Sequence, residues 1–204
     1  MMARWRTVLA TVVVAYGALA LAGVAVIYSG IYDIAADAPH WGLASRLFET
    51  ARERSIKAHA AGIKAPTGLD SEAMIITGVD HFAAHCAVCH GAPGVPKGDI
   101  ANGLYPAPPD LALSAARYSG GELFWIVRHG IKMTGMPGWA DHSDEEIWAI
   151  VAFIRKLPGM TPEAYAKLIQ AAMRQDGQQH QPGAHQHGAH RHGTHGQPER
   201  QDNR

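Results

Sequence analysis

The sequence predicts an all-α domain that follows one long apolar helix and precedes a polar tail. Apolar residues recur at helical spacing in several segments, and two Ser-x-x-Glu patterns mark helix starts. No segment alternates between apolar and polar residues as a half-buried β-strand does. A chain of 204 residues is long enough for one domain with a substantial core and for additional segments.

The charge and the cysteine content exclude some classes of protein. Lysine and arginine total 18, as do aspartate and glutamate, so the composition does not indicate a polyanionic partner such as nucleic acid. Residues 70–158 hold ten acidic and six basic side chains, whereas both flanks are more basic. Two cysteines are too few for a disulfide framework.

The first element is an uncharged apolar stretch, residues 8–28, preceded by Arg4 and Arg6. As a helix its 21 residues would span about 32 Å, close to the hydrocarbon thickness of a bilayer. We predict that residues 1–28 form a cytoplasmic stub and a transmembrane anchor, because arginines on the short side favour the cytoplasm. The alternative is a signal peptide cleaved near the small residues 36–38. Either interpretation places the remaining chain in a bacterial periplasm, in the first case as a single-pass protein of the inner membrane.

Residues 29–69 are expected to form a juxtamembrane connector. Within it, residues 41–62 have large apolar side chains on one helical side and charged side chains elsewhere, which predicts an amphipathic helix. Such a helix can lie on the membrane surface or pack against the following domain, and the sequence leaves both placements open.

The compact domain is predicted over residues 70–158. Asp70 is a candidate helix cap, and apolar residues from Ile75 to Cys86 recur at helical spacing after it. Five prolines and four glycines within residues 91–110 exclude regular structure over most of that stretch.

The second half of the domain contains two clearer helices. Ser119 and Glu122 fit a capping box for a helix that ends at Gly130, and Ser143 and Glu146 fit another. A further helix is expected within residues 159–175, starting at Thr161–Pro162 and ending near Arg174. Residues 176–204 lack nearly all apolar side chains and are predicted to be a disordered, histidine-rich tail.

Both cysteines lie in HCAVCHG, residues 85–91, where His90 directly follows Cys89. A structural zinc site would need further ligands, such as a second cysteine pair, and a thioredoxin-like CxxC would follow a β-strand. A disulfide across two residues would be strained and would leave His90 without a role. Covalent haem uses all three residues, since the thiols of Cys86 and Cys89 add to the vinyl groups and His90 ligates the iron. We therefore predict one covalently bound haem c.

The sixth ligand of the iron is expected in the loop around residues 131–139. Met136 precedes Pro137, which stiffens the backbone, and glycines at 135 and 138 allow that backbone to approach a porphyrin. We favour Met136 over Met133, with His129 as a further alternative. The methionines at positions 74, 160 and 173 are expected to be packing residues, and the histidines at 81, 85 and 142 surface residues.

Four segments resemble class I monohaem cytochromes c when taken together. They are HFAAHCAVCHG, GLYPAPPDL, WIVRHGIKMTGMPGW and DEEIWAIVAFIRKLP, within residues 70–158. The stretch is most similar to the cytochrome c subunits of bacterial haem–copper oxidases. SGIYDIAADAPHW and ETARERSI, upstream of this stretch, are similar to segments that precede such domains in membrane-anchored cytochromes.

The resemblance implies a class I cytochrome c fold in which Met136 is the axial ligand opposite His90. It also implies that the first and last helices of the fold cross near Gly78 and Phe82 on one side and Trp148 on the other. A carbonyl near Pro106 or Pro108 would accept a hydrogen bond from Nδ1 of His90. The histidine-rich tail departs from the family pattern.

These features predict one-electron transfer rather than an enzymatic reaction. The chain would be a membrane-tethered periplasmic carrier, or a subunit of a respiratory or dehydrogenase complex, with redox proteins as partners. An acidic surface around the haem edge would suit a basic partner. The rival is a haem-based sensor or peroxidase with a labile sixth ligand.

The tail allows two interpretations. Its imidazoles can bind copper, nickel or zinc, which predicts a metal-handling role, or the tail is simply solvated. The candidate secondary metal ligands are His185, His187, His190, His192 and His195.

Overall fold

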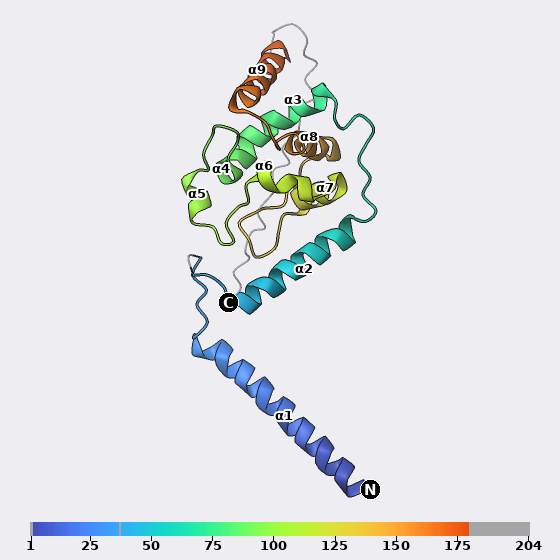
Figure 1. The fold of residues 1–204 in the computed structure, drawn as a ribbon, viewed down its shortest axis with the longest axis vertical. Helices are drawn as coiled ribbons and strands as arrows, with labels where there is room; N and C mark the ends of the chain where they lie inside the picture. Colours follow the sequence, from blue (N-terminus) through green and yellow to red (C-terminus); the bar gives the residue numbers. More distant parts are fainter. Residues whose placement is uncertain (1, 37, 180–204) are drawn as a thin grey trace, which may run out of the picture.

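A computed structural model describes residues 2–36 and 38–179 of the chain. Over this part every regular element is a helix, apart from an isolated bridge between Ala92 and Val95, so the predicted all-α class is confirmed. The tail histidines predicted as metal ligands lie outside the described residues. Figure 1 shows one long helix extending away from a group of shorter helices.

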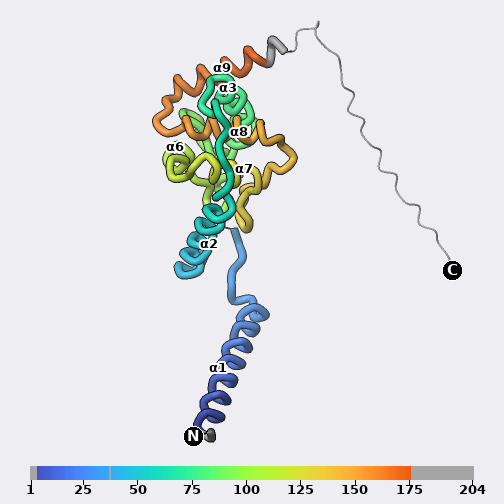
Figure 2. The backbone as a smooth tube through the Cα atoms, turned by 90° about the vertical axis from the view of Figure 1, so that its right-hand side faces the viewer, coloured from blue at the N-terminus to red at the C-terminus, as the bar shows by residue number. Residues whose placement is uncertain are grey.

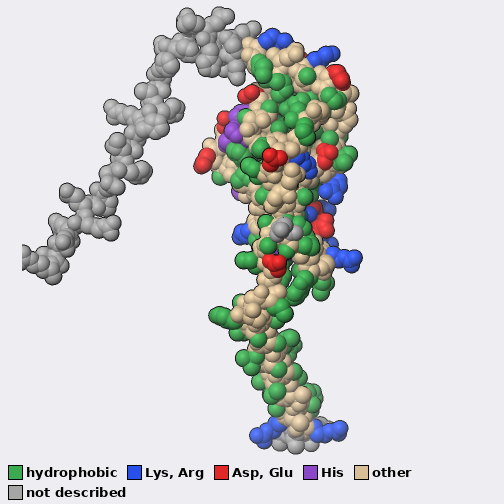
Figure 3. All heavy atoms as spheres, turned by 90° about the vertical axis from the view of Figure 1, so that its left-hand side faces the viewer, with side chains coloured by type: hydrophobic (Ala, Val, Ile, Leu, Met, Phe, Trp, Pro, Cys, Tyr) green, Lys and Arg blue, Asp and Glu red, His purple; other side chains and the backbone are tan. Residues whose placement is uncertain are grey.

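The long helix, α1, covers Met2–Ser29. Its segment Arg4–Ser29 is long and apolar enough to cross a membrane, by length and composition, and none of its most apolar stretch is buried against the rest of the protein. Figure 3 shows apolar side chains along this helix and basic ones at its free end. Both a membrane anchor and a signal sequence have these properties.

The remaining helices form the domain and the connector that leads to it. The connector contains α2 (Gly42–Ala60). The domain helices are α3 (Glu72–His81), the π-helical turn η1 (Phe82–Cys86), α4 (Ala87–His90), α5 (Asp99–Asn102), α6 (Leu111–Ser114), the 3₁₀ turn η2 (Ala115–Arg117), α7 (Gly120–His129), α8 (Asp144–Ile154) and α9 (Pro162–Gln179). In Figures 1 and 2, α9 lies over α3 at the end of the domain opposite α1.

The core is built around the crossing of α3 and α8. A Cβ atom on Gly78 would lie 1.9 Å from the carbonyl oxygen of Ala149, so the two backbones are in direct contact. Phe82 and Phe153 pack beside this contact with ring centroids 4.9 Å apart. The crossing expected near Gly78 and Trp148 is confirmed, although Gly78 contacts the residue after Trp148. The Trp148 ring itself stacks on Phe124 of α7, at 4.5 Å between centroids.

The helix boundaries agree with the sequence signals in most places. Both predicted capping boxes are present, with Ser119 and Ser143 as the N-caps. The predicted cap of the first domain helix is wrong, because Ser71, not Asp70, accepts the hydrogen bond from the N–H of Met74. The Asp70 carboxylate lies instead 3.6 Å from the guanidinium of Arg155.

The two halves of α2 have different surroundings. The C-terminal half packs against α7, burying Ile56 and Ala60. The hydroxyl of Tyr118 donates a hydrogen bond to the Glu53 carboxylate at 2.8 Å. This bond links α2 to the domain. The N-terminal half instead exposes the large apolar side chains Leu43, Leu47 and Phe48. Of the two placements left open by the sequence, contact with the domain is observed for the C-terminal half.

Candidate functional site

The turn that carries the two cysteines follows α3 without a break. Cys86 is the last residue of the π-helical turn, and Cys89 and His90 form the end of α4. Gly91 then adopts φ +70, a conformation that favours glycine and that ends the helix. Both thiols are free and half-buried, and Cys86 packs against the hydrophobic core.

The raised pKa of the Cys86 thiol does not suit thiol–disulfide chemistry. Burial, and secondarily the neighbouring Cys89, raise the pKa of the Cys86 thiol to about 12. Redox-active CxxC motifs need the opposite, a lowered thiol pKa. The described residues also contain no β-strand to which a thioredoxin-like motif could be attached. These observations agree with the exclusion of a redox CxxC, and both thiols are free for covalent attachment.

His90 is oriented by the backbone of the proline-rich segment. Its Nδ1 lies 2.9 Å from the carbonyl oxygen of Pro109, so Nδ1 carries the proton and Nε2 keeps a free lone pair. The acceptor expected near Pro106 or Pro108 is thus the carbonyl of Pro109, the residue that directly follows Pro108. The Pro108 carbonyl instead accepts a hydrogen bond from the ammonium of Lys97 at 2.5 Å. Three prolines lie within residues 106–109, and their spacing in the sequence does not indicate which carbonyl meets His90.

The ionisation of His90 suits a metal ligand. Burial lowers the pKa of the imidazole, and the positive charge of Lys97 lowers it further, while the hydrogen bond to Pro109 raises it. Because burial is the largest of these influences, the ring is held in the neutral form, which is the form that binds a metal.

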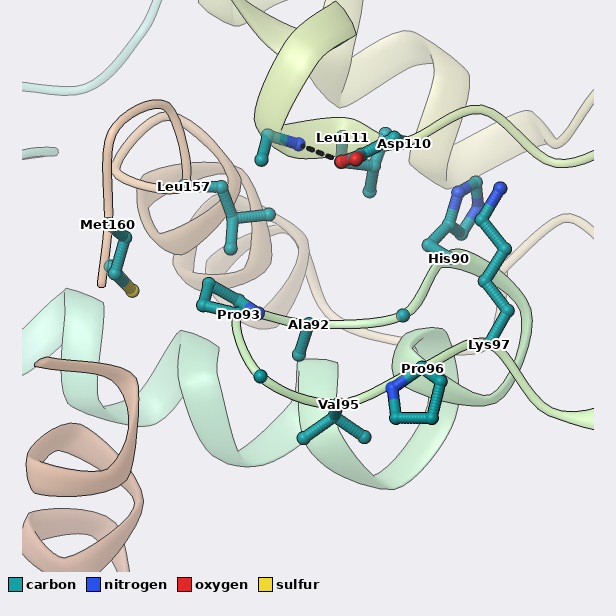
Figure 4. A pocket seen from close by; sticks show the side chains of 13 residues that line it. His90, Ala92, Pro93, Val95, Pro96, Lys97, Asp110, Leu111, Leu157 and Met160 are labelled. Atoms are coloured by element: carbon teal, nitrogen blue, oxygen red, sulfur yellow. Dashed lines mark hydrogen bonds between the residues drawn. The ribbon is translucent and has the colours of Figure 1, made fainter. Parts of the chain in front are cut away.

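A pocket of about 360 Å³ lies beside His90 (Figure 4). The loop of residues 91–97 and the start of α6 line it, together with Leu157 and Met160. His90 and Lys97 stand at one end of the view and Met160 at the other. Neither cysteine nor Met136 is among its lining residues, so the pocket lies beside the imidazole and does not join it to the predicted sixth ligand.

The loop after α7 distinguishes between the two candidate methionines. Met136 is half-buried and packs against the hydrophobic core, whereas Met133 is 73% exposed and has a φ of +60. The alternative ligand His129 is exposed and packs on Trp125, with ring centroids 5.2 Å apart. Of the two methionines, only Met136 packs against the core on which Cys86 also packs.

Hydrogen bonds hold the backbone of the Met136 loop. The Met136 N–H donates to the hydroxyl of Thr134 at 3.1 Å, and the Met136 carbonyl accepts from the N–H of Ile131 at 3.2 Å. A Cβ atom on Gly130 would lie 2.6 Å from that same carbonyl oxygen, so the loop folds back directly onto the end of α7. The loop is thus tied down on both sides of Met136.

The sequence interpretation missed one cluster of side chains. His81, His85 and His142, expected to be surface residues, each offer a ring nitrogen within 4.8 Å of the others. Only His85 is exposed, and the other two are half-buried. The spacing of His81 and His85 by four positions was a signal for part of this cluster, but His142 is distant in sequence.

The helical fold and the CxxCH turn are those of a cytochrome c domain, a class of domain that transfers electrons through haem c. More particularly, residues 73–154 match the family model of cytochrome C oxidase, cbb3-type, subunit III, and form a cytochrome c domain of that family. The match extends from α3 through α8 and includes both cysteines, His90 and Met136. The predicted resemblance is therefore confirmed. A search of curated proteins found no match to this chain.

The residues of this domain fit a covalent haem c. Two free thiols stand three positions apart, an imidazole presents a free Nε2, and a half-buried thioether packs against the same core as Cys86. Thiols, imidazole and thioether are the groups that attach and ligate haem in cytochromes c.

Proposed function

We propose that the protein carries one haem c bound to Cys86 and Cys89, with His90 and Met136 as axial ligands, and transfers single electrons. One observation carries this proposal: the CxxCH turn and Met136 pack against a single core, and backbone hydrogen bonds orient both the imidazole and the methionine loop. When the side chains that bind a cofactor are already held in position, they move little as the cofactor gains or loses an electron.

Different residues of the chain would bind and orient the cofactor. When bound, haem supplies an iron that alternates between the ferric and ferrous states. The Pro109 carbonyl keeps the His90 ring in one tautomer and one orientation. The hydrogen bonds of Thr134 and Ile131 restrict the backbone that presents Met136. The buried helix α8 packs on α3 and excludes water from the core. Haem held against such an apolar core would be favoured in its less charged ferrous state.

The structure favours a carrier over a haem-based sensor or peroxidase. The rival function requires a sixth ligand that leaves the iron readily, which a loosely held glycine loop would allow. The Met136 loop contains glycines at 135 and 138, but its backbone is bonded to α7 and to itself. A Cβ atom on Gly138 would lie 2.9 Å from the carbonyl oxygen of His129, which is a second close contact between the loop and α7.

We further propose that α1 remains as a membrane anchor and holds the haem domain in a bacterial periplasm. Its length and composition support the anchor, and the arginines at its free end support a cytoplasmic N-terminus. Only residues 30–41 separate α1 from α2, which is itself packed on the domain. The haem would therefore stay close to the membrane surface, where a carrier or subunit of a respiratory or dehydrogenase complex meets its redox partners.

The ligand assignment is tested by replacing each methionine of the loop. Met136→Ala is expected to abolish the far-red sulfur-to-iron charge-transfer band of the oxidised protein and to let carbon monoxide bind the reduced form. Met133→Ala is the matched control, because Met133 is in the same loop but is exposed, and it should leave the band intact. If the band survives in Met136→Ala, Met136 is not the ligand.

Attachment and function are tested separately. Cys86→Ala with Cys89→Ala should eliminate haem that stays with the polypeptide under denaturing conditions. Haem retained by the double variant would contradict covalent binding at these thiols. In the wild type, rapid one-electron reduction and reoxidation without binding of carbon monoxide supports the carrier, and ready binding of carbon monoxide by the wild type supports the sensor.

A further inference from the structure

Three histidines gather at the surface where α3, the π-helical turn and the loop before α8 meet. His81 is the last residue of α3, His85 lies in the turn that leads to Cys86, and His142 precedes the N-cap of α8. The ring centroids are 5.8 to 6.4 Å apart in the three pairs. Figure 3 shows histidine side chains collected on the surface of the domain. The proposed electron-transfer function uses none of these three residues.

Neighbouring residues keep the three rings close to one another. Trp139 packs against His85 and His142, with centroids 5.0 and 5.2 Å away. The guanidinium of Arg128 donates a hydrogen bond to the carbonyl of His142 at 3.2 Å, which fixes the loop. On the other side His85 lies within the π-helical turn, a rare geometry that is often found at functional sites.

A carboxylate adds negative charge beside the cluster. Oε1 of Glu146 lies 3.9 Å from Nε2 of His81, while Oε2 accepts a hydrogen bond from the N–H of Ser143 at 2.7 Å. The hydrogen bonds with Ser143, and to a smaller extent the nearby His142 and His81, lower the pKa of Glu146. A fixed carboxylate next to imidazoles orients the rings and increases their basicity, as the outer partners of metal-bound histidines do.

We propose that His81, His85 and His142 bind one divalent late transition metal ion, Zn²⁺ or Cu²⁺, at a site separate from the haem. Zinc–nitrogen bonds are about 2.0–2.1 Å long, so the ligand nitrogens around a tetrahedral ion stand about 3.4 Å apart. The three nitrogens, now within 4.8 Å of one another, must approach by at most about 1.4 Å. Rotations of these incompletely buried side chains are sufficient for this movement. Three protein ligands leave the fourth position to water or to Glu146.

The position of the site gives the bound ion a structural consequence. His85 immediately precedes Cys86, and His142 follows Met136 by six positions. An ion shared by these histidines would therefore link the turn that carries the thiols to the loop that carries the methionine. This proposal does not depend on the ligation of the haem iron, because the three imidazoles are present whether or not Met136 is a ligand.

The test is a zinc titration of the full-length haem protein in detergent against a competing chromophoric chelator. Because the tail contains histidines that can also bind zinc, the parent protein for the titration has all six of them replaced by glutamine, with the chain length unchanged. These positions are His180, His185, His187, His190, His192 and His195. The parent is expected to bind one zinc ion, and X-ray absorption at the zinc edge should count three imidazoles.

Variants in this background locate the ion. His142→Ala and His81→Ala should each weaken zinc binding at least tenfold, and the control His59→Ala should leave it unchanged, since His59 lies on α2 outside the cluster. Glu146→Gln should weaken binding by about tenfold while keeping the capping box, because glutamine also serves at that position. Haem absorption and helical circular dichroism verify that each variant is folded. A parent protein that binds no zinc, or folded variants that bind it like the parent, would overturn the proposal.

Discussion

The contact between Gly78 and Ala149 predicts that even a small side chain at position 78 lowers the stability of the domain. Replacing Gly78 by alanine adds one Cβ atom at the crossing of α3 and α8. That atom would lie 1.9 Å from the Ala149 carbonyl oxygen and 3.0 Å from Cβ of Phe153. Because the closest atom belongs to the backbone of a buried helix, no side-chain rotation can relieve the contact, and the helices themselves must separate.

The size of the effect follows from the distances. An ordinary contact at this position is at least 3.4 Å, so α3 and α8 must separate locally by about 1.5 Å. Overpacking of this kind costs typically 1–3 kcal/mol, and a clash with backbone belongs near the upper end. Alanine regains about 1 kcal/mol through its higher helix propensity. The net loss of unfolding free energy is therefore about 2 kcal/mol, or about 8–16 °C in the unfolding temperature of so small a domain.

The assay compares two glycine-to-alanine variants of the full-length haem protein by urea unfolding, followed by circular dichroism. Gly120→Ala is the matched control, because Gly120 is also buried in a helix but its added Cβ would find its nearest neighbours at 3.6 and 3.7 Å. Gly78→Ala should unfold at about 1 M less urea, whereas Gly120→Ala should be unchanged or slightly stabilised. If the two variants unfold together, the close crossing does not support the domain.

Two further predictions concern the hydrogen bonds that join or begin helices. The Tyr118 hydroxyl binds Glu53, and burial first, then that carboxylate, raise the pKa of Tyr118 above its usual 10.0. The protonated phenol therefore stabilises the folded state below about pH 10, and this contribution is lost as the pH rises through the higher folded pKa. Tyr118→Phe should be less stable at neutral pH by about 1 kcal/mol and should lose less stability between pH 9 and pH 11 than the wild type. Ser143→Ala should cost about 1 kcal/mol in urea unfolding while Ser143→Asp retains the cap, and equal stability of the two would contradict the observed capping box.

The features that were predictable from the sequence are those with local causes. A capping box requires only a serine and a glutamate three positions apart, so the starts of α7 and α8 were recognisable without any tertiary information. The preference for Met136 over Met133 also came from local causes, the neighbouring proline and glycines. Met136 packs against the core and Met133 is exposed, and the role of Met136 as ligand stays a prediction. The Asp70 cap failed for a related reason: Asp70 and Ser71 are adjacent, both residue types cap helices well, and propensity does not choose between them.

The acceptor for His90 and the histidine cluster had no comparable local signal. The segment that carries Pro106, Pro108 and Pro109 presents three carbonyls of similar chemistry, and which one meets His90 depends on how that segment folds over α4. The histidine cluster depends on how the π-helical turn and the crossing of α3 and α8 are arranged in the folded domain. The π-helical turn changes the direction of the His85 side chain relative to His81, and the crossing of α3 and α8 brings His142 to both.

The crossing of α3 and α8 also positions the histidine cluster. Gly78 lies three residues before His81, and Ala149 lies three residues after Glu146, so the contact between the helices sets the separation of the carboxylate and the first imidazole. A separation of about 1.5 Å at Gly78 exceeds the movement that the three imidazoles need to close around an ion. Gly78→Ala should for this reason weaken zinc binding at the cluster as well as stability, although Gly78 provides none of the proposed zinc ligands. If zinc binding is unchanged in the folded variant, the cluster is positioned by its own loop and by Trp139 rather than by the core.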